Sequence, residues 1–388
     1  MADRRLKDLR ACWPYYGNKR QAAPLINSLL GDDVKNFVVP FAGALGEFLV
    51  RAPAQVETVN DLDGLVVNAW RAIKYSPERV ALLCDEPVHE VTLHARHDEL
   101  VRARTTMGKR KRALKSGRRR HVPLAEYLRS SDRAHDVRLA AQWIWGASCW
   151  LGSGWCRDPV KKIPRLCGQG GQPHPGLGVA RPVTPRKIPR IGGPGSGDGR
   201  PDLGRGVTKR QVPRLSGGGG HPGLGSGVHA RSGVGRTWRA RPHLSHRGQG
   251  VTAPGAHTDA LVEWMEALSD RLRWTRIICG DWTRAVTKAV TTSHGLTAVS
   301  LDPTYDHGLR SKRIYRKDDP SVSPAVRAWA RERGGDRKLR ITLAGKWEEH
   351  DELLEHGWTR HPWRDDGEVI WASPHCLRSE FGPLFDRK

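Results

Sequence analysis

Apolar and polar positions along the chain follow two spacings, which together predict a mixed α/β protein. Short apolar runs rich in β-branched residues predict buried strands at residues 37–41, 55–60, 274–279, 296–301 and 339–344. Helical spacing predicts helices at residues 19–30, 47–51, 62–75, 261–273, 325–333 and 347–356. Residues 77–150 are helical by the same pattern, and a closing hairpin is expected at 358–373, turned at 365–367. Strands that alternate with helices are typical of a parallel sheet covered by helices.

The strand predicted at 296–301 leads into Asp302, Pro303, Thr304 and Tyr305. In an open α/β sheet, ligands bind at the carboxyl ends of strands, which is where Pro303 ends this one. The exocyclic amine of a nucleobase is a poor nucleophile unless a site accepts hydrogen bonds from both of its N–H groups. Asp302 and the Pro303 carbonyl could accept them, and Tyr305 offers a ring for an extruded base. The alternative is a strand that ends in a proline turn with a surface tyrosine.

Three further segments form an ordered pattern with this loop. Residues 15–19 read Tyr-Tyr-Gly-Asn-Lys, residues 37–46 read Phe-Val-Val-Pro-Phe-Ala-Gly-Ala-Leu-Gly, and Asn60-Asp61 ends the second predicted strand. Together with Asp-Pro-Thr-Tyr, these segments resemble the Dam-like class of adenine-N6 DNA methyltransferases. The resemblance covers roughly residues 13–75 and 257–373 and skips the middle of the chain.

The resemblance implies a Rossmann-like sheet that uses S-adenosylmethionine as its cofactor and double-stranded DNA as its substrate. The catalytic domain would comprise residues 13–76 and 257–376, and it would methylate the flipped adenine without a metal. Asp302, Pro303 and Tyr305 would be catalytic. The expected cofactor-binding residues are Tyr16, Lys19, Phe41, Gly43, Gly46, Asp61, Asp281 and Trp282.

Several of these positions also have a structural interpretation. Asp61 could accept from a ribose, or an acid at this point could cap the next helix, with Asp63 as the cap. Asp281 and Trp282 could hold the adenine of the cofactor, or they could be a helix cap and a packed ring. Lys19 could bind the cofactor carboxylate or be a solvated lysine in the first turn of a helix.

The sequence departs from the family pattern at Asn18, Leu45 and Thr304, where the family has Gly, Gly and Pro. Thr304 leaves both proposed acceptors and the ring in place, so we expect activity to survive. It also leaves open another base-modifying transferase, with an altered cofactor or an RNA target. A non-catalytic DNA-binding protein is the other alternative, and the presence of Asp302 and Tyr305 counts against it.

Charge favours nucleic acid as the partner. The 388 residues carry a formal net charge of +24, and the sequence pI is about 10.3. Residues 101–120 hold ten Lys or Arg and no acid. A loop after the catalytic segment adds further basic residues. From these two stretches we expect DNA contacts by Lys109, Arg110, Arg112, Arg118, Arg119, Arg310 and Arg313.

The helical residues 77–156 are expected to form a basic insertion, followed at 157–250 by a region rich in Gly, Pro and Arg. That region has 18 Lys or Arg against three Asp, and it repeats one phrase at 162–168, 187–193 and 211–217. Each copy carries a Pro-Arg pair, which places Arg165, Arg190 and Arg214 at regular intervals. The region is either a target-recognition segment or an unspecific basic tether.

The remaining composition gives no sign of a membrane or a metal site. Seven cysteines are scattered without a Cys-x-x-Cys pair, which indicates reduced thiols. The N-terminus lacks the apolar segment of a signal peptide, and no lipidation motif or amphipathic anchor is present. We expect a cytoplasmic, DNA-associated protein that is a monomer or a weak dimer.

Overall fold

The structure is a computed structural model of the chain, and it describes residues 9–105, 122–150, 155–157, 256–306 and 319–378. All of these residues belong to one compact unit, which is formed by Met1–Leu166 together with Val234–Lys388. The repeat-rich region at 158–250 lies outside the described residues. The two ends of the chain therefore build one body, as the predicted discontinuous arrangement of strands requires.

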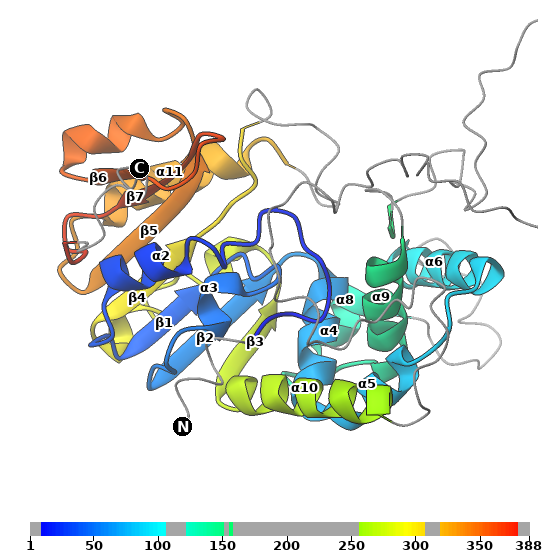
Figure 1. Cartoon of the computed structure of the whole chain (residues 1–388). Helices are drawn as coiled ribbons and strands as arrows, with labels where there is room; N and C mark the ends of the chain where they lie inside the picture. The colour runs from blue at the N-terminus through cyan, green and yellow to red at the C-terminus, as the bar shows by residue number, and fades with distance from the viewer. Residues whose placement is uncertain (1–8, 106–121, 151–154, 158–255, 307–318, 379–388) are drawn as a thin grey trace, which may run out of the picture. The chain divides into compact units, whose positions relative to one another are not determined.

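Seven strands of the described residues form one sheet in the order β3-β2-β1-β4-β5-β7-β6 (Figure 1). The strands are β1 (Asn36–Val39), β2 (Val56–Asp61), β3 (Thr275–Cys279), β4 (Thr297–Leu301), β5 (Leu339–Lys346), β6 (Thr359–Pro362) and β7 (Glu368–Ala372). Neighbours from β3 to β5 are parallel. The predicted α/β class is confirmed, and this mostly parallel sheet is compatible with a Rossmann-like fold.

The closing hairpin is confirmed, but its place in the sheet was not predictable from its sequence. β7 pairs antiparallel with β5, and β6 pairs with the far side of β7. The later strand of the hairpin is therefore the inner one. This order brings the first residue of β7, Glu368, opposite Lys346 at the carboxyl end of β5.

Helices lie on both sides of the sheet, and a group of them gathers beyond β3 (Figure 1). The helices are α2 (Ala23–Leu30), α3 (Gly46–Leu49), α4 (Gly64–Tyr75), α5 (Pro77–Cys84), α6 (Glu90–Thr105), α8 (Leu124–Arg129), α9 (Val137–Cys149), α10 (Ala256–Leu272) and α11 (Val322–Arg333). Of the five apolar residues whose spacing predicted α10, Leu261, Met265, Leu268 and Leu272 are fully buried and Val262 is half-buried. Among the described residues, no helix combines the length and the apolar character needed to cross a membrane.

Two predicted helices differ from the structure for local reasons. The helix expected from residue 19 begins at Ala23, because Pro24 has no N–H to donate and suits only the first turn. The helix expected at 347–356 is a turn followed by the 3-10 helix η5 (Asp351–His356). Trp347 has a φ of 53°, a left-handed conformation that interrupts a right-handed helix.

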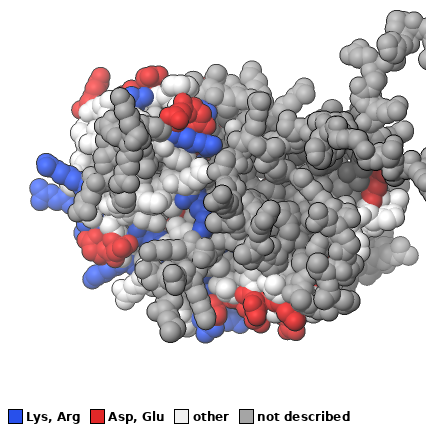
Figure 2. All heavy atoms as spheres, in the orientation of Figure 1, with Lys and Arg blue, Asp and Glu red and all other residues white. Residues whose placement is uncertain are grey.

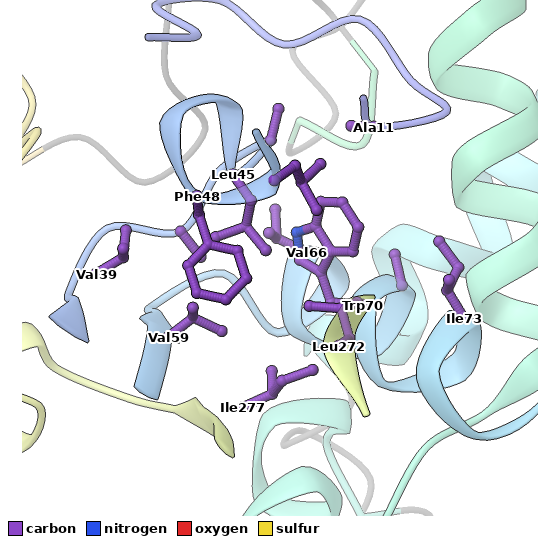
Figure 3. Packing of buried hydrophobic residues seen from close by; sticks show 14 of the residues in the cluster. Ala11, Val39, Leu45, Phe48, Val59, Val66, Trp70, Ile73, Leu272 and Ile277 are labelled. Carbon is purple, nitrogen blue, oxygen red and sulfur yellow. The ribbon is translucent and has the colours of Figure 1, made fainter. Parts of the chain in front are cut away.

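The main core joins the sheet to the helices beyond β3. Figure 3 shows Leu45 and Phe48 beside Trp70 and Val66, with Ile277 of β3 below them. Trp70 is fully buried, and its indole N–H donates to the Gly43 carbonyl at 2.9 Å. The loop after β1 is therefore anchored in the core on which the sheet rests.

Candidate active site

The site is set by the point where the strand order reverses. β1 pairs with β2 on one side and with β4 on the other, so the carboxyl ends of β1 and β4 are neighbours. In open α/β sheets this switch point is where ligands bind. The predicted Asp-Pro-Thr-Tyr segment begins directly after Leu301, the last residue of β4. The segment predicted to be catalytic therefore lies at the switch point.

Lys19 connects this segment to the N-terminal motif. Its Nζ lies 2.9 Å from Asp302 Oδ1 and 5.2 Å from the centre of the Tyr305 ring. It also donates to the Gly17 carbonyl at 2.9 Å. The Lys19 side chain is only 2% exposed, so the solvated alternative for this lysine is wrong. The structure thus brings together two predicted motifs that are more than 280 residues apart in sequence.

Two more carboxylates surround the same lysine. Glu368 Oε2 lies 3.8 Å from Lys19 Nζ, and the buried Glu47 accepts from Ser300 Oγ at 3.1 Å. Burial raises the pKa of Asp302 to about 6, although Lys19 opposes the shift. Burial also raises the pKa of Glu47 and of Glu368, again against the charge of Lys19. One buried cation therefore acts on three acids whose pKa values burial raises above the ordinary range.

The loop after β1 is held from two sides. Asp61 Oδ2 accepts from the Gly43 N–H at 2.9 Å, and the Trp70 indole binds the Gly43 carbonyl. Gly43 has a φ of 45°, and a Cβ there would lie 2.7 Å from the Tyr15 ring. Asn60 donates to the carbonyls of Pro40 and Gly280, which joins the ends of β1 and β3 to β2. The Asn-Asp pair therefore shapes the loop.

Two departures from the family pattern are accommodated in the same place. A Cβ on Gly46 would lie 1.8 Å from Asn18 Oδ1, so this glycine makes room for the Asn18 turn. Leu45 adopts a left-handed conformation with φ 53° and ψ 40°, and its side chain is 1% exposed. A left-handed leucine costs about 1–2 kcal/mol. Burial of its side chain in the core offsets that cost.

Other predicted cofactor residues have clear structural roles. Asp63 caps α4 by accepting from the Leu65 N–H at 2.8 Å, which confirms it as the cap. Asp281 is exposed at the end of β3 and caps the short 3-10 helix η3 (Trp282–Arg284). The Trp282 ring stacks on Phe41 with centroids 6.2 Å apart. Tyr16 is 60% exposed, and it is the neighbouring Tyr15 that lies against Gly43.

A tether that the sequence did not indicate fixes the end of the Asp-Pro-Thr-Tyr segment. Glu349 Oε1 accepts from the Asp306 N–H at 2.8 Å and from Ser323 Oγ at 2.6 Å. Its Oε2 accepts from the Lys346 N–H at 3.1 Å. Glu349 thereby ties the loop to the end of β5 and to the start of α11.

Glu47 and Glu368 were also missed. Each is a single acid in an otherwise apolar segment, Gly-Glu-Phe-Leu in α3 and Glu-Val-Ile-Trp-Ala in β7. An acid among core residues needs a partner, and that signal alone would have marked both residues for attention.

The excess of Lys and Arg over Asp and Glu belongs to residues outside the described ranges. Described residues contain 30 Lys or Arg and 33 Asp or Glu, whereas the remaining residues contain 35 and eight. On the face shown in Figure 2, acidic and basic side chains of the described part are interspersed. Every predicted DNA-contacting residue lies outside the described residues, at positions 109–119, 165, 190, 214, 310 and 313.

Comparison with known proteins adds no assignment to this geometry. No protein-family model matches the chain, and a search of curated proteins finds no match.

Proposed function

We propose that the chain transfers a methyl group from S-adenosylmethionine to the exocyclic amine of adenine in double-stranded DNA. The observation that carries the proposal is the meeting of Asp302 and Tyr305 with Lys19 at the reversal of strand order. These residues belong to two of the segments that resemble the Dam-like methyltransferases. We also propose that residues 77–156 and 157–250 are insertions within this sheet.

The residues at the neighbouring strand ends fit a nucleoside cofactor. The positive φ of Gly43 keeps the loop after β1 free of a side chain at its tightest point. Asp61 at the end of β2 and the exposed Asp281 at the end of β3 supply carboxylate acceptors, and Trp282 adds an aromatic ring. When bound, S-adenosylmethionine would supply an electrophilic methyl group on a sulfonium.

The protein's part in the reaction would be to bind, orient and polarise the amine. The Asp302 carboxylate and the Pro303 carbonyl would accept its two N–H groups, and Tyr305 would stack on the base. Lys19 contacts Asp302 and Glu368, so we assign it to the catalytic loop instead of to the cofactor carboxylate.

Mass spectrometry of nucleosides from the DNA of cells that express the protein tests this proposal. The wild type should produce N6-methyladenine, Asp302→Ala should produce none, and Asp365→Ala should match the wild type. Asp365 is an exposed acid in the β6–β7 turn and provides the control for loss of a carboxylate.

Other outcomes would decide between the alternatives. A different modified nucleoside that disappears in Asp302→Ala would replace the chemistry and keep the site. Unmodified DNA with all three proteins, together with no binding of S-adenosylmethionine in calorimetry, would contradict the proposal.

A further inference from the structure

The cluster around Lys19 has an uneven charge balance that the proposed reaction does not yet explain. Lys19 Nζ contacts Asp302 at 2.9 Å and Glu368 at 3.8 Å, and both Lys19 and Glu368 are more than nine-tenths buried. Glu368 is brought there by the pairing of β7 with β5. It touches neither the loop after β1 nor the Asp-Pro-Thr-Tyr segment in any described hydrogen bond.

We propose that Glu368 is a positioning residue, which shares Lys19 with Asp302 and so keeps Asp302 able to accept a proton from the substrate amine. This inference rests on the proposed function. It adds a role for a residue outside the segments that resemble the methyltransferase family.

The electrostatics explain why a shared lysine matters. An aspartate that has a lysine to itself at 2.9 Å is held in its ionised form and is a weak base. A second carboxylate beside the same cation weakens this hold and adds a repulsion between like charges. Both effects favour the protonated form of Asp302, in the same direction as its burial.

The other groups that face Asp302 do not reverse this balance. Glu47 from α3 and Glu349 from the turn after β5 are acids, and both raise the pKa of Asp302. The centre of the Tyr305 ring lies 5.2 Å from Lys19 Nζ. Among the described groups that act on Asp302, Lys19 is the one cation.

The proton balance of the reaction gives Asp302 its task. As the new N–C bond forms from the lone pair of the amine, the bond between the methyl carbon and the sulfonium sulfur would break, and its electron pair would stay on sulfur. The nitrogen becomes positive and must lose one proton. The carboxylate of Asp302 takes that proton and later releases it to water, which returns it to its starting state. Lys19 stays an ammonium throughout, and Glu368 stays a carboxylate beside it.

The ionisation of Asp302 can be followed without any methyl transfer. The free energy of unfolding in urea is measured from pH 4 to pH 8 for the wild type and for Asp302→Asn. Their difference should change steadily up to about pH 6, where folded Asp302 is half ionised, and begin to level off there. In a Glu368→Gln background we expect this levelling to occur about one pH unit lower.

Two more variants make the result specific. Glu368→Asp keeps the charge and should restore the levelling to near pH 6. Glu57→Gln neutralises another buried acid at the opposite end of the sheet, and it should lower stability without moving the levelling. An unchanged levelling in Glu368→Gln would overturn the proposal.

The rate of methyl transfer supplies the second readout. In single turnovers, the acidic limb of the pH–rate profile should move by the same amount in Glu368→Gln. A lower rate with an unmoved profile would show a merely structural role. If no methyl transfer occurs even in the wild type, the proposed function and the proton transfer fail together. A shifted levelling would then still establish the shared lysine.

Discussion

Two clusters of buried charge lie at opposite ends of the same sheet, and they are built differently. At the amino ends, Arg271 meets Glu57 in a bidentate pair with distances of 2.7 and 2.9 Å. Thr275 Oγ1 and the Ala54 N–H also donate to this carboxylate. At the carboxyl ends, Lys19 serves Asp302 and Glu368, with Glu47 close by.

The two clusters differ in how far their carboxylates are compensated by cations and hydrogen-bond donors. Glu57 has one guanidinium and additional donors, so its charge is fully compensated where it is buried. Among the described residues, the carboxylates around Lys19 outnumber the cation, and burial raises their pKa values although Lys19 lowers them. Perturbed groups of this kind gather at functional sites because a reaction needs a proton acceptor or donor.

The largest expected effect comes from breaking the structural pair. Arg271→Met should destabilise the protein by about 3–5 kcal/mol, because it leaves Glu57 buried without its partner. The cost should fall less between pH 8 and pH 5 than the cost at the Lys19 cluster, since Thr275 and Ala54 still donate to the carboxylate. Urea unfolding at both pH values measures it. A cost that disappears at pH 5 would show that the two clusters behave alike.

The stability cost of the matching substitution at the Lys19 cluster should depend on pH. In the wild type, the charge of Lys19 lowers the pKa of Asp302, Glu47 and Glu368. Lys19→Met removes that charge. Each pKa should rise further, so stability is retained at pH 5 and lost as pH increases through the raised values. We expect a cost of about 3 kcal/mol at pH 8 and a clearly smaller cost at pH 5. A cost that is equal at both values would contradict the comparison.

The smallest expected effect concerns the position of the turn that carries Lys19, and no charge is changed. Gly46→Ala places a methyl group 1.8 Å from Asn18 Oδ1 and 2.6 Å from the Arg20 backbone nitrogen, so the turn that carries Lys19 must move. Such overpacking costs about 1–3 kcal/mol. Asn18→Ala in the same chain should recover part of it, because only the side-chain clash is relieved. Urea unfolding of the two single variants and the double variant measures the recovery, and strict additivity would contradict the contact.

The sequence predicted the elements well where the local pattern decides them. β4 is buried at every position, α10 buries the expected stripe, and Asp63 caps α4 as expected. These features depend on neighbours a few residues away. The exceptions at residues 19–22 and at Trp347 arise from single residues that interrupt a periodic pattern.

The candidate site was predictable only in part. Asp302, Tyr305 and Lys19 were singled out from short motifs, and the structure brings them together. Glu47, Glu349 and Glu368 were missed, since each is a single acid whose partners lie far along the chain. The segments that hold most of the basic charge lie outside the described residues, so the predicted DNA contacts stay predictions.

The sequence by itself determined the strands and helices and the acid, aromatic and lysine that mark the site, because periodicity and motif spacing are local properties of a chain. Only the tertiary structure decided which carboxylates share Lys19. That outcome depends on β7 pairing with β5 inside β6, a choice made by contacts between distant strands. The balance of buried charge at the site follows from that choice, and no local pattern contains it.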